Sequence, residues 1–187
     1  MHSGWAAMVA VAGSPTEPEV LDRRRIEIAK RTDNMGPAQP YHMARELGIG
    51  KAQKYLDREA VAARELAIAA LRKVMEDFGD RRAIACGMLI GSGRIPSTLE
   101  GTLASHPAIH TAEGEFFREA IIQAAGTIKL PVRRVKEKEL FEVAGVQFGI
   151  ASVELRERLD GLGKILGRPW RQDEKYAALV AWLAASE

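Results

Sequence analysis

Residues 83–90 read AIACGMLI, an apolar run without a single charge, bounded by an arginine and a glycine. Such a short run is typical of a strand buried on both faces, which usually lies inside a parallel sheet. A second strand is predicted over residues 128–132, where apolar residues alternate with Lys129 and Pro131, and the proline favours an edge position. These two segments are therefore the predicted strands of the sheet.

Helices are predicted between the two strands. Ser97-Thr98-Leu99-Glu100 has the pattern of a capping box, and a second helix is predicted from Thr111 to Ala125, where Gly126 ends it. Two strands separated by helices and joined by short turns form the unit that builds a parallel α/β sheet.

The segments before and after this unit are predicted to be helical. Short helices are expected over residues 20–30 and 41–47, and a long one from Asp57 as N-cap to Phe78. More helices are expected toward the C-terminus. The predicted fold is therefore a helix-rich α/β class with a small, mostly parallel sheet flanked by helices and an N-terminal helical extension. The predicted divisions are a flexible leader over 1–18, a helical extension over 19–80 packed on the core, and an α/β core domain over 81–187.

The first residues contain a short apolar run, Trp5 to Ala12, with a small-residue pattern at its end. It has some features of a secretory signal, but no lysine or arginine precedes it and the run is short. The alternatives are a frayed leader or a terminal strand added to a sheet edge. The default prediction is a cytoplasmic protein.

Composition excludes several classes of protein. The 187 residues are 47% hydrophobic, and 27 basic against 25 acidic side chains give a net charge of +2, which argues against a dedicated binder of polyanions. No run of apolar residues is long enough for a transmembrane helix. A single cysteine, Cys86, excludes an intrachain disulfide and a cysteine-cluster zinc site.

The first candidate site is the turn Gly91-Ser92-Gly93-Arg94, which follows the buried strand. Glycines let a backbone aim its amides at an anion, and a following helix start adds its positive dipole end. Arg94 could add a bidentate contact to phosphate or carboxylate. Neither the Walker A spacing nor the full dinucleotide fingerprint is present, so the alternative is a plain strand-to-helix turn.

The second candidate site is the segment from His106 to Glu113. His110 lies four residues after His106, and if Pro107 is the first helical residue, His110 and Glu113 share a helix face. His106, His110 and Glu113 are therefore the candidate catalytic residues, either as general acid and base or as ligands of a divalent metal, which is the candidate cofactor. The alternative is that these are ordinary turn and capping residues.

The segment from Lys129 to Lys138 carries five basic side chains diluted by two glutamates. It could contact nucleic-acid phosphates, but no aromatic residues are interleaved for base stacking. A solvated edge strand is the favoured interpretation, so nucleic acid is a possible but not a favoured partner.

The order of Glu113, the 130–132 strand and Asp173 loosely resembles the later half of RuvC-like, ribonuclease H-like nucleases. That resemblance implies metal-dependent phosphodiester cleavage by converging carboxylates. The chain departs from it in two respects. Residues 1–80 are predicted to be helical where that fold begins with a β-hairpin, and the buried strand at residues 84–90 carries no acid.

The leading functional hypothesis is a small protein that binds an anionic, phosphate- or nucleotide-containing ligand where the Gly91–Arg94 turn meets the histidines and Glu113. In an enzymatic version, His110 is the general base of a hydrolysis. The alternatives are a divergent nuclease and a non-catalytic, oligomeric interaction module. Two strands are few for a sheet, so either dimerisation or an unrecognised N-terminal strand is expected to complete it, and a homo-oligomer is the predicted state.

Overall fold

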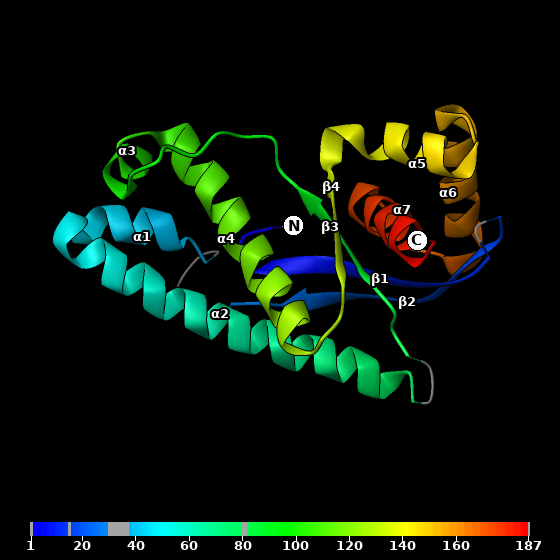
Figure 1. The fold of residues 1–187 in the computed structure, drawn as a ribbon, viewed down its shortest axis with the longest axis horizontal. Coiled ribbons are helices and arrows are strands. Elements are labelled where there is room, and N and C mark those ends of the chain that lie inside the picture. Colours follow the sequence, from blue (N-terminus) through cyan, green and yellow to red (C-terminus); the bar gives the residue numbers. More distant parts are fainter. Residues whose placement is uncertain (1, 15, 30–37, 80–81, 187) are drawn as a thin grey trace. The chain divides into compact units, whose positions relative to one another are not determined.

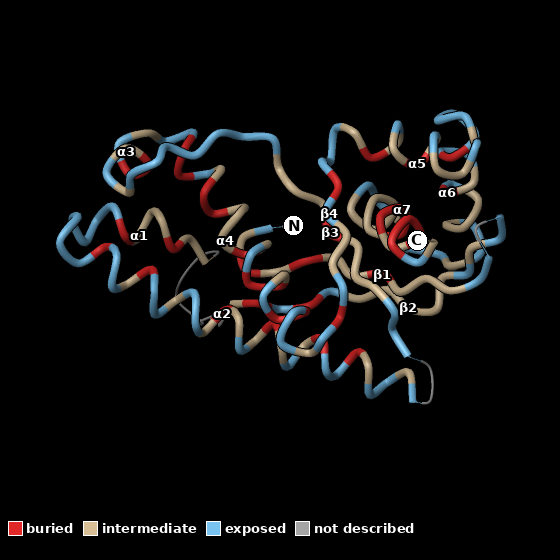
Figure 2. The backbone as a smooth tube through the Cα atoms, viewed as in Figure 1, coloured by how far each residue is buried: buried red, intermediate tan, exposed pale blue. Residues whose placement is uncertain are grey.

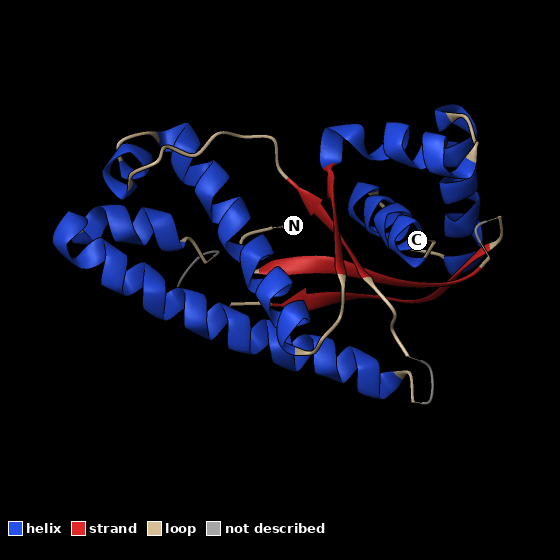
Figure 3. Cartoon of the chain, viewed as in Figure 1, coloured by secondary structure: helices blue, strands red, loops and turns tan. Residues whose placement is uncertain are grey.

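The computed structural model describes residues 2–14, 16–29, 38–79 and 82–186 (Figure 1). Helices dominate it, and its strands are confined to two small sheets (Figure 3). The elements in chain order are β1 (Trp5–Gly13), β2 (Pro18–Glu27), α1 (Pro40–Leu47), α2 (Ile49–Asp77), β3 (Cys86–Ile90), α3 (Leu99–Leu103), α4 (His106–Thr127), β4 (Val132–Lys136), the 3₁₀ turn η1 (Glu137–Glu139), α5 (Leu140–Phe148), α6 (Ser152–Leu166) and α7 (Gln172–Ala185). The predicted helix-rich α/β class with a small sheet is confirmed.

The chain forms two compact units, and each of them is assembled from separate stretches of sequence. The first unit contains residues 1–6, 26–82 and 91–129, and the second contains residues 7–25, 83–90 and 130–187. β1 and β2 therefore each contribute residues to both units. The predicted domain boundary, at residues 80 and 81, falls outside the described residues.

The first sheet is an antiparallel pair of β1 and β2, and it corrects two predictions. The leader predicted over residues 1–18 contains the strand β1, and the helix predicted over residues 20–30 is replaced by β2. Ile26 and Ile28 lie two residues apart and are both buried, 6% and 0% exposed. Ile26 lies near the end of β2 and Ile28 just beyond it, so the buried pair marks the end of the strand and the helical interpretation was wrong.

The second sheet is a parallel pair of β3 and β4, as the uncharged run and the second strand predicted. Cys86 pairs with Val132 and the register continues to Ile90 with Lys136. The predicted second strand was placed too early, because Ile128 is the C-cap residue of α4 and β4 begins only at Val132. The expectation of one mostly parallel sheet holds only for this pair, because the strands of the described residues form two separate sheets.

The second unit has its own hydrophobic core, built mainly from leucines of α5, α6 and α7. α7 packs on β3 so closely that a Cβ atom on Gly87 would lie 2.2 Å from the carbonyl oxygen of Val180. β1 and β2 add Val9 and Val20 to this core. Arg23 of β2 also donates hydrogen bonds to the carbonyl oxygens of Leu166 and Gly167, at 2.9 Å each, where α6 ends.

The first unit is a cluster of helices in which α2 and α4 make the most extensive contact. α2 begins at Ile49, earlier than the predicted N-cap Asp57, because the buried stripe of this helix already starts at Ala52. α1 is separated from α2 only by Gly48, which has φ +73°, and packs Ala44 against Ala52 and against Leu103 of α3. Figure 2 shows the buried stretches that run along α4.

The start of α4 matters most for the candidate site. Its N-cap is Ser105, whose hydroxyl accepts a hydrogen bond from the amide of Ala108 at 3.4 Å, and Pro107 occupies the first turn. The helix predicted to start at Thr111 therefore starts five residues earlier, at His106. A proline is tolerated there because the first amides of a helix have no partner within it.

Among the described residues, no helix combines the length and apolar character needed to cross a membrane.

Candidate metal centre

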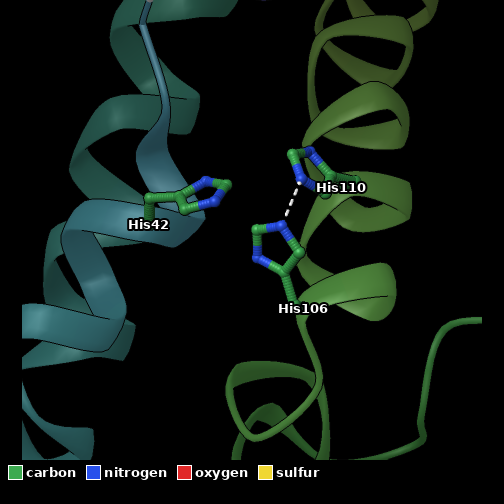
Figure 4. A group of neighbouring side chains, drawn as sticks. All are labelled: His42, His106 and His110. Atoms are coloured by element: carbon green, nitrogen blue, oxygen red, sulfur yellow. Dashed lines mark hydrogen bonds between the residues drawn. The ribbon is translucent and has the colours of Figure 1, made fainter.

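Three of the four histidines of the chain lie together in the first unit. His42 comes from α1, and His106 and His110 come from the first turns of α4 (Figure 4). Each offers a ring nitrogen, and these nitrogens all lie within 4.8 Å of one another. His42 is partly buried, whereas His106 and His110 are exposed, so the space between the rings is open to solvent.

The two histidines of α4 owe their proximity to the helix itself. Residues four apart are neighbours on a helix face, and the early start of α4 brings His106 into that relation with His110. Their Nε2 atoms are 3.0 Å apart. Two imidazole nitrogens bound to one tetrahedral zinc ion at ~2.05 Å each lie roughly 3.3 Å from one another. The pair therefore needs only a small adjustment to bind one ion.

Glu113 holds the third histidine in place. Its side chain is buried, at 3% exposure, and its Oε1 atom lies 2.9 Å from Nδ1 of His42. The same oxygen accepts the backbone amide of His42 at 3.4 Å. Because a carboxylate accepts hydrogen bonds, Nδ1 of His42 acts as the donor and Nε2 keeps its lone pair. A carboxylate that orients a histidine in this way is the usual outer partner of a metal-binding imidazole.

Local packing explains why α1 presents His42 to α4. Ala44, on the same short helix, is fully buried in the core formed with α2 and α3. Tyr41 packs edge-to-face on Phe116, one turn beyond Glu113, with 6.2 Å between ring centroids. These two contacts hold α1 against its neighbours on either side of His42 in the sequence.

The arrangement is chemically suited to a divalent transition metal. Neutral imidazole is a good ligand for zinc, copper, nickel and iron, whereas magnesium and calcium prefer oxygen. Three imidazoles leave one tetrahedral position for water, which is the arrangement of catalytic zinc sites; structural sites use four protein ligands. Within the described part of the chain, these three histidines are the only group of this kind.

Sequence reasoning found three of the four residues in this cluster. His110 and Glu113 lie three residues apart on α4, the relation predicted for the case in which Pro107 is the first helical residue, and His106 joins them because α4 begins one residue earlier still. His42 was missed because it is a single histidine in a short helix, far from the others in the sequence. Only the packing of α1 on α4 brings it to them, and no local pattern encodes that contact.

The Gly91–Arg94 turn is placed elsewhere. The amide of Gly91 donates to Oε1 of Glu115 at 3.2 Å, and a Cβ on Gly93 would lie 2.5 Å from the side chain of Thr111. On a helix with 3.6 residues per turn, Thr111 lies about 100° around the axis from His110, and Glu115 lies about 140° from it. The structure therefore does not bring the turn and the histidines to one surface of α4.

The helix that follows this turn also differs from the predicted one. α3 has five residues, and its N-cap is Thr98, whose hydroxyl accepts the amide of Gly101 at 3.1 Å. The N-cap predicted at Ser97 is thus shifted by one residue, and the predicted capping box does not form, because the residue three positions after Thr98 is Gly101. Ser92 and Arg94 are exposed, and anion binding by this turn stays a prediction.

Two of the carboxylates that a nuclease would require, Glu113 and Glu115, have different partners. Glu113 faces His42, whereas Glu115 contacts Arg118 at 2.9 Å and the amide of Gly91. Asp173 belongs to the other compact unit, near the start of α7. Glu113 and Glu115 therefore point to different sides of α4.

Searches against models of protein families, against curated proteins and against solved structures each found no match. The functional argument therefore depends on the site itself.

Proposed function

We propose that this protein binds one divalent transition-metal ion, with zinc as the best fit, through His42, His106 and His110. The observation that carries the proposal is the combination of three clustered imidazoles with a buried carboxylate behind one of them. Burying a carboxylate is unfavourable unless it has a partner. Glu113 is buried with His42 as its partner, an arrangement that is not expected of histidines that merely lie near one another on a surface.

The reaction class that this site supports best is hydrolysis. A metal held by three neutral imidazoles keeps a net positive charge and one open position, and it lowers the pKa of a bound water toward neutrality. The net positive charge and the open position both follow from having three neutral imidazoles as the ligands. Glu113 is engaged with His42, so its role is to position that ligand, and it is not free to act as the general base.

Metal binding is tested by titrating Zn²⁺ into the metal-free full chain, with a competing chelator to measure affinity. One ion per chain is expected. His110→Ala and His42→Ala each remove a ligand, so we expect a loss greater than the ~10–100-fold that removal of an outer partner causes. Glu113→Gln keeps the size of the side chain but weakens the hold on His42, and about 10–100-fold weaker binding is expected.

The chain supplies its own control for this experiment. His2, the remaining histidine, stacks on Trp5 with 4.0 Å between ring centroids and takes no part in the cluster. His2→Gln should leave the zinc affinity unchanged. Equal affinities in the wild type and in His42→Ala, or a loss in His2→Gln, would contradict the proposed site.

Hydrolysis is tested separately, with p-nitrophenyl acetate and bis(p-nitrophenyl) phosphate as substrates. We expect turnover by the zinc-loaded protein that disappears with a chelator and in His110→Ala but persists in His2→Gln. If zinc binds with the expected affinity but turnover does not exceed that of free Zn²⁺, the site binds metal without being hydrolytic toward these substrate classes.

A further inference from the structure

A groove lies beside α1 in the first unit, and neither the sequence motifs nor the metal centre account for it. Its volume is about 290 Å³, close to the lower end of the range for small-molecule sites. It is bordered by α1, α2, α3, one turn of α4 and the segment before α3. The lining residues are Tyr41, Gln53, Leu56, Asp57, Ala60, Ile95, Pro96, Ser97, Thr98, Leu99, Thr102 and Phe116.

The floor of this groove is apolar and aromatic. Leu56 is 6% exposed, and Tyr41 and Phe116 present their rings to each other at an interplanar angle of 88°. Burial raises the pKa of Tyr41 above its ordinary 10.0, so its hydroxyl stays protonated at neutral pH. The phenol can therefore accept a hydrogen bond from a ligand as well as donate one.

The lining of the groove carries negative charge only. Asp57 is the only charged residue in it, and one of its carboxylate oxygens, Oδ1, accepts a hydrogen bond from Gln53 at 2.7 Å. The groove offers an anion no lysine or arginine. A cation, in contrast, would find the carboxylate of Asp57 and, in the same lining, the aromatic side chains of Tyr41 and Phe116.

We propose that this groove binds a small organic cation, an amine that carries an aromatic or similarly flat apolar body. The ammonium group is placed toward Asp57, and the apolar body lies on the floor formed by Tyr41, Leu56 and Phe116. This inference goes beyond the metal centre and does not require it, because no histidine of the cluster lines the groove.

Three probes with one aromatic body and different charges test the proposal: tryptamine, indole and indole-3-acetate. Amide chemical-shift changes of the full chain are followed by NMR in the presence of a chelator, so that the result does not depend on metal. Tryptamine should bind most tightly and indole-3-acetate most weakly, with the shifts centred on Tyr41, Thr102 and Phe116. If these residues show no shift changes at about 10 mM tryptamine, the affinity is below what even a ligand of this size should reach, and the proposal is overturned.

Two pairs of variants separate the effects of shape and charge. Ala60→Leu adds bulk at the rim of the groove and should abolish binding, whereas Ala69→Leu makes the same change at an exposed position of α2 outside the groove. Asp57→Asn should reduce the preference for tryptamine over indole by about 2–5-fold, the range of an exposed ion pair. Glu65→Gln, another exposed acid of α2, should leave it unchanged. Binding of indole-3-acetate as tight as that of tryptamine, or unchanged binding in Ala60→Leu, overturns the proposal.

Discussion

Gly87 lies in β3 where the backbone of α7 passes too close for any side chain. Its missing Cβ would be 2.2 Å from the carbonyl oxygen of Val180, and a backbone atom cannot move aside as the end of a side chain can. Gly87→Ala should therefore lower the free energy of unfolding by ~1–3 kcal/mol or more, as overpacking of a core does. Urea denaturation measures the change.

Gly161 provides the comparison within the same unit. It lies inside α6, and a Cβ there would meet no atom within 4 Å. Gly161→Ala should stabilise the protein by about 0.5–1 kcal/mol, because alanine favours the helix. If both substitutions changed stability by the same amount, the close approach of α7 to β3 would not be the reason.

Cys86 makes stability depend on pH in alkaline solution. Burial raises the pKa of its thiol from 9.0 to about 11, so the folded protein keeps the proton that the unfolded chain releases. The full stability is present below pH 9 and is lost as the pH rises through 11. The loss attributable to this thiol should be about 2 kcal/mol near pH 10.5.

Urea denaturation of the wild type and of Cys86→Ala, at pH 8 and near pH 10.5, isolates this contribution. The other groups that titrate in this range are common to both proteins, so the difference between the two pH dependences belongs to the thiol. Parallel pH dependences would show that the thiol ionises equally well in the folded and unfolded states.

At the scale of elements, the proposed metal joins α1 to α4. His42 is the ligand that α1 contributes. In the absence of a metal, the contacts of α1 with α4 include the bond of His42 to Glu113, the edge contacts of its ring with His106 and His110, and the contact of Tyr41 with Phe116. When free Zn²⁺ is present at about 100 times its dissociation constant, conformations in which α1 has separated from α4 and released the metal become ~100-fold less populated. Hydrogen exchange of the α1 amides should slow accordingly.

The readout for this prediction is hydrogen exchange followed with and without Zn²⁺. Amides of α5, in the other compact unit, serve as the internal reference, and His42→Ala should lose the protection of α1 while it keeps that of α5. Equal slowing in α1 and α5 would indicate a general effect of zinc rather than a clamp on one helix.

The predictable elements were those specified by neighbours in sequence. The uncharged run at β3, the helix that ends at Gly48 and the helix that carries His110 each have a local pattern of burial or termination. β2 was misread because three consecutive arginines, Arg23 to Arg25, interrupt it and Ile26 is its only buried residue. In the candidate metal centre, the spacing of His106, His110 and Glu113 can be read from the sequence, whereas His42 depends on the tertiary packing of α1, which no local pattern records.

At the scale of the molecule, the predicted core domain over residues 81–187 lacks parts that the structure assigns to its units. It omits Val9, Val20 and Arg23, which contact the core and the end of α6 in the second unit. It also omits α2, the main partner of α4 in the first unit. We therefore expect this fragment, expressed alone, to lack fixed tertiary structure.

Near-ultraviolet circular dichroism reports on this directly, since Trp170 and Trp182 are both present in the fragment and in the full chain. Trp182 stacks on Phe148 with 4.2 Å between ring centroids, so a folded second unit gives it an ordered surrounding. A fragment with the near-ultraviolet spectrum of the full chain and a cooperative urea transition would contradict this expectation.

The interleaving of the two units also affects the order in which the chain can fold while it is being synthesised. β1 is synthesised well before α7, but Val9 of β1 belongs to a core that is completed by Leu183 of α7. At 5–20 residues per second, roughly 10–35 s separate the emergence of these two residues. During that interval the apolar strand β1 lacks the helices of this core, which makes the nascent chain a natural client for chaperones that shield exposed strands.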